Sequence, residues 1–199
     1  MTCNWYICAY FFTMNKPNDI STVSYCAFLR GVNVNGTNMK MKDVCTLFEN
    51  QGIKSAYSIL ASGNILFDSE KPKSELKQIL EKALSLHFNY EAFMFIKTKN
   101  EIERIIRENP FESDPLFHIY CIITATEYQT ENLLNEEIEK IIDTEQEQVL
   151  IIGENIYWKV LKGNTLDSKF GKTLAKKNIK NLFTSRNMNT IHKILRKMN

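Results

Sequence analysis

Short apolar runs that alternate with amphipathic helical stretches most constrain what this chain can fold into. Residues 23–29 are β-branched and apolar and end in a loop of glycine and asparagine, which is typical of a buried strand. In residues 39–50 the apolar side chains recur at helical spacing, and Gly52 follows as a stop signal. The same reasoning predicts strands at 56–60 and 65–68, a helix after Ser74, a strand at 92–96 and a helix at 99–108.

The second half of the chain repeats this mixture less regularly. We expect a strand at 118–123, a helix at 127–142, a hairpin of 149–152 with 156–161, and basic helices at 168–178 and 189–198 on either side of a turn at 184–187. The sequence therefore predicts an α+β fold of two closely packed α+β subdomains with mixed or antiparallel sheets and amphipathic helices. We place an N-terminal extension at 1–22, the first subdomain at 23–112 and the second, with the basic C-terminal helices, at 113–199.

The composition excludes several classes of protein. The 199 residues are 44% hydrophobic and 24% charged, as in a soluble globular protein and unlike a disordered one. The five cysteines are odd in number and show neither paired nor metal-like spacing, which argues against a disulfide framework and favours a reducing cytoplasm. The three histidines are scattered, so we expect no metal site. We also expect no cofactor. No stretch approaches the roughly 18 apolar residues that a membrane helix needs, so we expect no membrane partner.

The first 22 residues form an extension ahead of the first predicted strand. Residues 5–12 are apolar, but no basic leader precedes them and no small-residue cleavage site follows before Lys16, so we do not interpret them as a signal peptide. The extension is an extra strand, a docked arm, or the product of a start codon upstream of the true start at Met14.

Charge is unevenly distributed along the chain. Residues 162–199 hold ten cations and one anion, whereas the remaining residues carry a net charge of −7. A cationic region of this kind attracts phosphate or another acidic surface, although lysine-rich helices are also common as solvated faces.

Two polar motifs sit where strands give way to loops. Arg30 directly follows the first predicted strand, and Gly31 and Gly36 come after it in the spacing of a phosphate-binding loop, but Thr37-Asn38 stands where such a loop needs Lys-Ser or Lys-Thr. Ser62-Gly63-Asn64 joins two further strands. Asparagines here serve either as local caps and turn residues or as donors and acceptors around a polar ligand, and the guanidinium of Arg30 suits bidentate contact with carboxylate or phosphate.

A third motif, Arg186-Asn187-x-Asn189-Thr190, lies near the other end of the chain. Its local interpretation is the start of the last helix, with Asn187 or Asn189 as the cap.

Together these motifs resemble the signature of a bacterial family known only as domain of unknown function 1697. In that family a strand ends in Leu-Arg-Gly-Ile-Asn-Val-Gly-Gly-x-Asn, a second strand contains Ser-Gly-Asn, and the chain closes with Thr-Thr-Arg-Asn-Trp-Asn-Thr; the resemblance spans residues 23–198. It implies that Lys169, in the pair Ser168-Lys169, joins the other motifs, but it implies no activity. This chain departs from the pattern at Ala61, Asn35 and Met188.

These observations predict that the Arg30 loop and the Arg186 motif meet in space at one site. We expect a binding module for a phosphorylated small molecule or a nucleic-acid phosphate; the alternatives are an enzyme acting on such a ligand, or a structural or partner-docking protein. The candidate ligand-binding residues are Arg30, Gly31, Asn33, Gly36, Asn38, Ser62, Gly63, Asn64, Lys169, Arg186, Asn187, Asn189 and Thr190.

Overall fold

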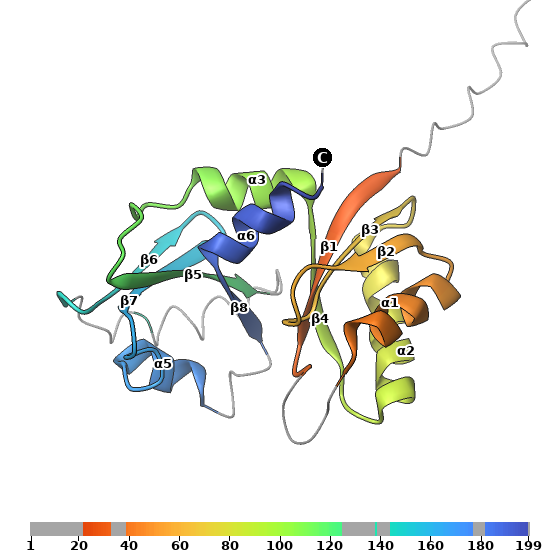
Figure 1. Cartoon of the computed structure of the whole chain (residues 1–199), viewed down its shortest axis with the longest axis horizontal. Helices are drawn as coiled ribbons and strands as arrows, with labels where there is room; N and C mark the ends of the chain where they lie inside the picture. The colour runs from red at the N-terminus through yellow and green to blue at the C-terminus, as the bar shows by residue number, and fades with distance from the viewer. Residues whose placement is uncertain (1–21, 33–38, 125–137, 139–143, 177–181, 199) are drawn as a thin grey trace, which may run out of the picture.

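Two antiparallel sheets of four strands each form the frame of the protein in a computed structural model (Figure 1). The structure describes residues 22–32, 39–124, 138, 144–176 and 182–198. The predicted extension at 1–22, except Thr22, most of the predicted helix at 127–142, and the candidate residues Asn33, Gly36 and Asn38 lie outside the described residues.

The first sheet has the strand order β2-β3-β1-β4, and each neighbouring pair is antiparallel. Its strands are β1 (Val23–Arg30), β2 (Lys54–Ser58), β3 (Asn64–Ser69) and β4 (Phe93–Thr98). Two helices, α1 (Met41–Asn50) and α2 (Lys73–Phe88), cover one face of it (Figure 1).

The second sheet has the order β6-β7-β5-β8 and is also antiparallel throughout. Its strands are β5 (Phe117–Thr124), β6 (Glu147–Ile152), β7 (Asn155–Leu161) and β8 (Phe183–Asn187). Among the described residues, this half includes the helices α5 (Lys169–Leu174) and α6 (Met188–Leu195), and α3 (Lys99–Arg107) leads into it. The predicted α+β fold is therefore confirmed.

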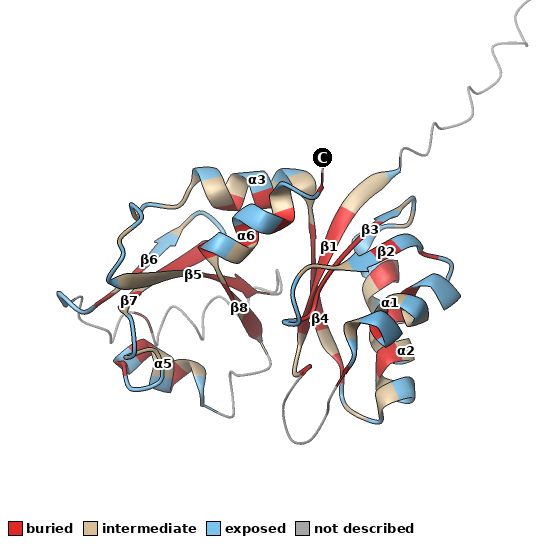
Figure 2. Cartoon of the chain, viewed as in Figure 1, coloured by how far each residue is buried: buried red, intermediate tan, exposed pale blue. Residues whose placement is uncertain are grey.

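Alternation along β1 explains how the two sheets share a core. Ala27 and Leu29 point into the cluster with α1 and α2, whereas Cys26 and Phe28 point to the other face. That other face packs in the inter-sheet cluster, which we define by its buried residues Cys26, Phe28, Leu66, Phe95, Ile102, Ile105, Cys121, Ile123, Tyr157, Met188, Ile191, Ile194 and Met198. Because both sheets, α3 and α6 contribute to it, the two halves are joined by apolar packing (Figure 2).

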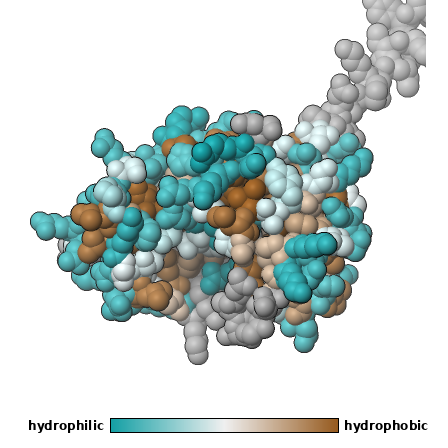
Figure 3. Space-filling view, viewed as in Figure 1, coloured by the Kyte–Doolittle hydropathy of each residue, from teal (hydrophilic) through white to brown (hydrophobic). Residues whose placement is uncertain are grey.

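The helices α3 and α6 lie together over the junction of the sheets. A capping box fixes the start of α3, since Thr98 accepts from the backbone N–H of Glu101 while the Glu101 carboxylate accepts from that of Thr98. Both helices turn apolar residues inward, and the surface above them is mostly hydrophilic (Figure 3). None of the described helices is long and apolar enough to cross a membrane.

The turn predicted at residues 184–187 is wrong. These residues belong to β8, which pairs with β5 at the edge of the second sheet, with Arg186 opposite Cys121. The sequence predicted a turn because Thr184 and Arg186 are polar, but both side chains are buried in this strand. The helix α5 is shorter than predicted, since it ends at Leu174.

Candidate functional site

Arg186 connects the two sheets through its guanidinium group. It lies in β8 with 8% of its surface exposed, and its Cζ atom sits 5.5 Å from the centre of the Phe28 ring. Its Nε donates to the side-chain oxygen of Asn64 at 2.6 Å, and its Nη2 donates to the carbonyl oxygens of Leu29 at 2.7 Å and Ser62 at 3.1 Å. These bonds tie an edge strand of the second sheet to β1 and β3 of the first.

The remaining N–H groups of Arg186 bind within its own strand. Nη1 donates to the hydroxyl oxygen of Thr184 at 2.6 Å and to the carbonyl oxygen of Ser185 at 2.8 Å. A guanidinium has five N–H donors, so every donor of Arg186 has an acceptor inside the protein. All of these acceptors are uncharged.

The Ser62-Gly63-Asn64 loop is shaped to receive this guanidinium. Asn64 is fully buried, and its Nδ2 donates to the Ile59 carbonyl and to the Ser62 hydroxyl, both at 2.9 Å, which turns its oxygen toward Arg186. Gly63 has a φ of +72°, and a Cβ atom there would lie 2.9 Å from the Cβ of Leu29. Only glycine meets both the backbone angle and the close approach of β1 at this position.

Arg30 makes the reciprocal contact from the first sheet to the second. Its Nη1 donates to the carbonyl oxygen of Phe183, and its Cζ lies 5.2 Å from the centre of the Phe183 ring. Unlike Arg186, it is only partly buried. No other acceptor for its guanidinium is present among the described residues.

The two guanidinium groups make this junction electropositive. Burial lowers the pKa of Arg186 to about 10, and the positive charge of Arg30 acts in the same direction. Burial also lowers the pKa of Arg30. Both groups remain protonated at neutral pH, yet within the described part of the chain neither forms an ion pair with a carboxylate.

Of the other candidate residues, one lies beside Arg30 and three lie at the start of α6. Gly31 follows Arg30 directly and has a φ of +74°. Asn187 stands at the opposite end of β8 from Phe183, where its side chain caps α6 by accepting from the N–H of Asn189 at 2.9 Å. Asn189 is exposed and Thr190 partly buried, both in the first turn of α6.

Lys169 is not close to Arg186. It begins α5, and its backbone N–H donates to the Glu147 carboxylate at 3.0 Å. Glu147 belongs to β6, the edge strand farthest from β8, so the strand that Lys169 contacts lies three strand spacings, about 14 Å, from the strand of Arg186.

Sequence reasoning missed several residues of the junction. Leu29 takes part through its carbonyl oxygen, and Phe183 through its carbonyl oxygen and its ring. A backbone acceptor leaves no signal in the type of residue that carries it. In the described part of the chain, no group of three histidine, cysteine, aspartate or glutamate side chains is placed to hold a metal ion.

Comparison with solved structures supports the fold. The structure of the conserved bacterial protein SP0830 from Streptococcus pneumoniae superposes with a TM-score of 0.76 at 21% identity, over 90% of this chain and 100% of that one. A protein of unknown function from Galdieria sulphuraria also aligns, with a TM-score of 0.24 at 10% identity over 84% of this chain and 99% of that one, too low to carry an argument. No curated protein matches the sequence.

The family model that matches the sequence is the one described as a protein of unknown function, DUF1697. It covers residues 23–157, which include Arg30 and the Ser62-Gly63-Asn64 loop but end before Lys169 and Arg186. With more than half of its length matched, this chain belongs to the DUF1697 family.

Proposed function

We propose that this protein binds the phosphate group of a small molecule or of a nucleic acid at the junction of the two sheets, with Arg30 as its direct contact. The observation that carries the proposal is the pair of uncompensated guanidinium groups. Arg186 places a positive charge inside the protein, and Arg30 adds a second one that is partly open to solvent. An anion at Arg30 would balance a charge that no carboxylate of the described residues balances.

The two arginines have different roles in this proposal. Every donor of Arg186 is engaged within the protein, so Arg186 positions β8 and supplies positive potential without touching the ligand. Arg30 gives one hydrogen bond to Phe183, which fixes the orientation of its planar group. The donors it has left suit two oxygens of one phosphate.

Titration of the full chain with a panel of nucleotides and sugar phosphates, and separately with mixed oligonucleotides, tests the proposal. For a small ligand, Arg30→Ala is expected to weaken binding by about 1.5–3 kcal/mol, the range for a hydrogen bond to a charged group. Arg30→Lys keeps the charge but loses the two-pronged geometry, so it should recover only part of the affinity. Lys193→Ala and Lys197→Ala, on the exposed side of α6 and just beyond its end, are the matched controls and should change little.

For a nucleic acid the difference between Arg30 and the lysines disappears. Many lysines each contribute a modest share, affinity falls steeply as salt rises, and the two lysine variants then matter as much as Arg30→Ala. Saturable binding that Arg30→Ala leaves unchanged would contradict the proposal. Absence of binding to either panel by the folded protein would favour a structural or partner-docking role instead.

A further inference from the structure

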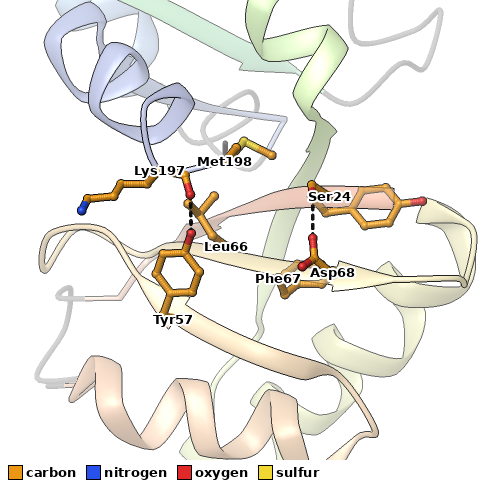
Figure 4. Close-up of a pocket in the computed structure, with 8 residues that line it drawn as sticks. Ser24, Tyr57, Leu66, Phe67, Asp68, Lys197 and Met198 are labelled. Carbon is orange, nitrogen blue, oxygen red and sulfur yellow. Dashed lines mark hydrogen bonds between the residues drawn. The ribbon is translucent and has the colours of Figure 1, made fainter. Parts of the chain in front are cut away.

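A pocket of about 200 Å³ opens at the end of the first sheet that is opposite to Arg30 (Figure 4). Its floor is the strand face around Leu66, which is almost completely buried, and the chain just after α6 covers one side. It is lined by Ser24, Tyr25, Tyr57, Leu66, Phe67, Asp68, Lys197 and Met198. Because Ser24 and Arg30 lie near opposite ends of β1, the pocket is about 20 Å from the anion site proposed above.

The hydroxyl groups of Ser24 and Tyr57, two of the residues that line the pocket, have their hydrogens committed to the protein. The hydroxyl of Ser24 donates to Oδ1 of Asp68 at 2.5 Å, and the phenol of Tyr57 donates to the carbonyl oxygen of Lys197 at 2.5 Å (Figure 4). What remains for a ligand are oxygen lone pairs on the two hydroxyls and the second carboxylate oxygen of Asp68. The pocket therefore presents acceptors and calls for a ligand that donates hydrogen bonds.

The charged residues of the pocket also favour a ligand with a positive charge. Asp68 is on its wall, whereas the ammonium group of Lys197 points away from it (Figure 4). Lys54 is the cross-strand partner of Asp68, but no ion pair joins them in the described part of the chain. The Tyr57 ring, 42% exposed, and the buried Leu66 and Met198 provide apolar and aromatic surface beside the carboxylate.

We propose that this pocket binds a small organic cation, a primary ammonium or guanidinium carried on a compact apolar body. The cationic group would meet Asp68 and the phenol oxygen of Tyr57, and the apolar part would rest on Leu66 and Met198. The volume exceeds that of an engineered cavity of about 150 Å³ that accommodates benzene, so an aryl amine of that size fits.

Three probes of similar shape test the charge requirement on the full chain: benzylamine, the neutral benzyl alcohol and the anionic benzoate. Binding is followed by amide chemical shifts, with the resonances of Ser24, Leu66 and Asp68 as local reporters. We expect saturable shifts there with benzylamine below about 10 mM, and shifts at least tenfold weaker with the other two probes. Equal responses to all three, or no saturable response to benzylamine, would overturn the proposal.

Asp68→Asn removes the charge but keeps an oxygen that accepts from Ser24, so it leaves the local structure supported. It should weaken benzylamine by about ten- to a hundredfold, as loss of one charged hydrogen bond does. Asp43→Asn, at an exposed site in the first turn of α1, is the matched control and should leave affinity unchanged. Tyr57→Leu removes the aromatic wall and should weaken binding by about two- to fivefold. Unchanged affinity in Asp68→Asn would refute the assignment even if the amine binds elsewhere.

Discussion

Replacing Arg186 by methionine tests whether its guanidinium holds the two sheets together. Methionine fills much of the same volume but donates no hydrogen bond, so the side-chain oxygen of Asn64 and the carbonyl oxygen of Leu29 lose partners at 2.6 and 2.7 Å. An acceptor left unsatisfied in a buried place costs about 1–3 kcal/mol. Two such losses amount to about 2–6 kcal/mol.

One effect acts in the opposite direction. Methionine removes the desolvation penalty of a guanidinium that lies 8% exposed among neutral acceptors. Because the carbonyl groups stay buried and unpaired, this relief offsets only part of the loss. We expect a net destabilisation of about 2–4 kcal/mol, which corresponds to a fall in Tm of about 5–15 °C for a chain of this length.

Equilibrium unfolding in urea measures the effect. The fluorescence of Trp158, buried in the second sheet, and far-UV circular dichroism together show whether both halves unfold in one transition. Arg186→Lys retains the charge, but a single ammonium cannot reach Asn64, Leu29 and Ser62 from one centre, so it should recover less than half of the loss. A double-mutant cycle with Asn64→Ala should give a coupling energy of about 1–2 kcal/mol.

The control is Arg196→Met, beyond the end of α6, where the side chain is exposed and, among the described residues, donates only to the carbonyl oxygen of His192 at 3.3 Å. It should change stability by no more than about 0.5 kcal/mol. If Arg186→Met were equally harmless, the bonds of Arg186 would not hold the sheets together, and apolar packing alone would join them.

Two further predictions concern the first half of the protein. Gly63→Ala should destabilise the folded protein more than Gly52→Ala does. Both glycines have a positive φ, but only at Gly63 would the added Cβ lie 2.9 Å from the Cβ of Leu29. The urea midpoints of the two variants measure the difference, and equal midpoints would contradict the steric argument. Burial alone would raise the pKa of Glu101, but the hydrogen bonds from the Lys73 ammonium and the α3 cap outweigh it and hold the pKa below the usual 4.5. The contribution of Glu101 to stability is therefore present above pH 4.5 and lost as pH falls through the folded-state pKa. Glu101→Gln should flatten the acid limb of a curve of unfolding free energy against pH. An unchanged limb would count against this pKa shift.

Most of the strands were predictable from the sequence, and their arrangement was not. β1 and β7 combine apolar residues with glycine or asparagine at or next to one end, and this pattern predicts a strand clearly. β8 was mistaken for a turn because two of its buried residues, Thr184 and Arg186, look like surface residues. Polarity indicates exposure only when the fold supplies no buried partner, and here Arg186 finds its partners in segments far earlier in the chain, at Leu29 and Asn64.

The sequence predicted that the two arginine motifs meet, but it did not predict the chemistry of the junction. Contacts with Leu29 and Asn64 place Arg186 beside β1 and the Ser62-Gly63-Asn64 loop, whereas residues 33–38 of the Arg30 loop lie outside the described residues. Sequence alone could not show that Arg186 spends all of its donors inside the protein, because several of its acceptors are backbone carbonyls. That the junction binds a ligand stays a prediction.

The neutral surroundings of Arg186 link its structural contacts to the proposed function. A carboxylate partner would have held the sheets together equally well, but it would have cancelled the positive potential at Arg30. Carbonyl, amide and hydroxyl oxygens satisfy the same N–H groups and, within the described part of the chain, leave the charge without a carboxylate partner. The fold thus maintains a buried cation beside a partly exposed one, at the energetic cost of burying a charge. A junction that served only to join two sheets could avoid that cost with apolar residues, so the buried charge is the feature that the proposed anion site would use.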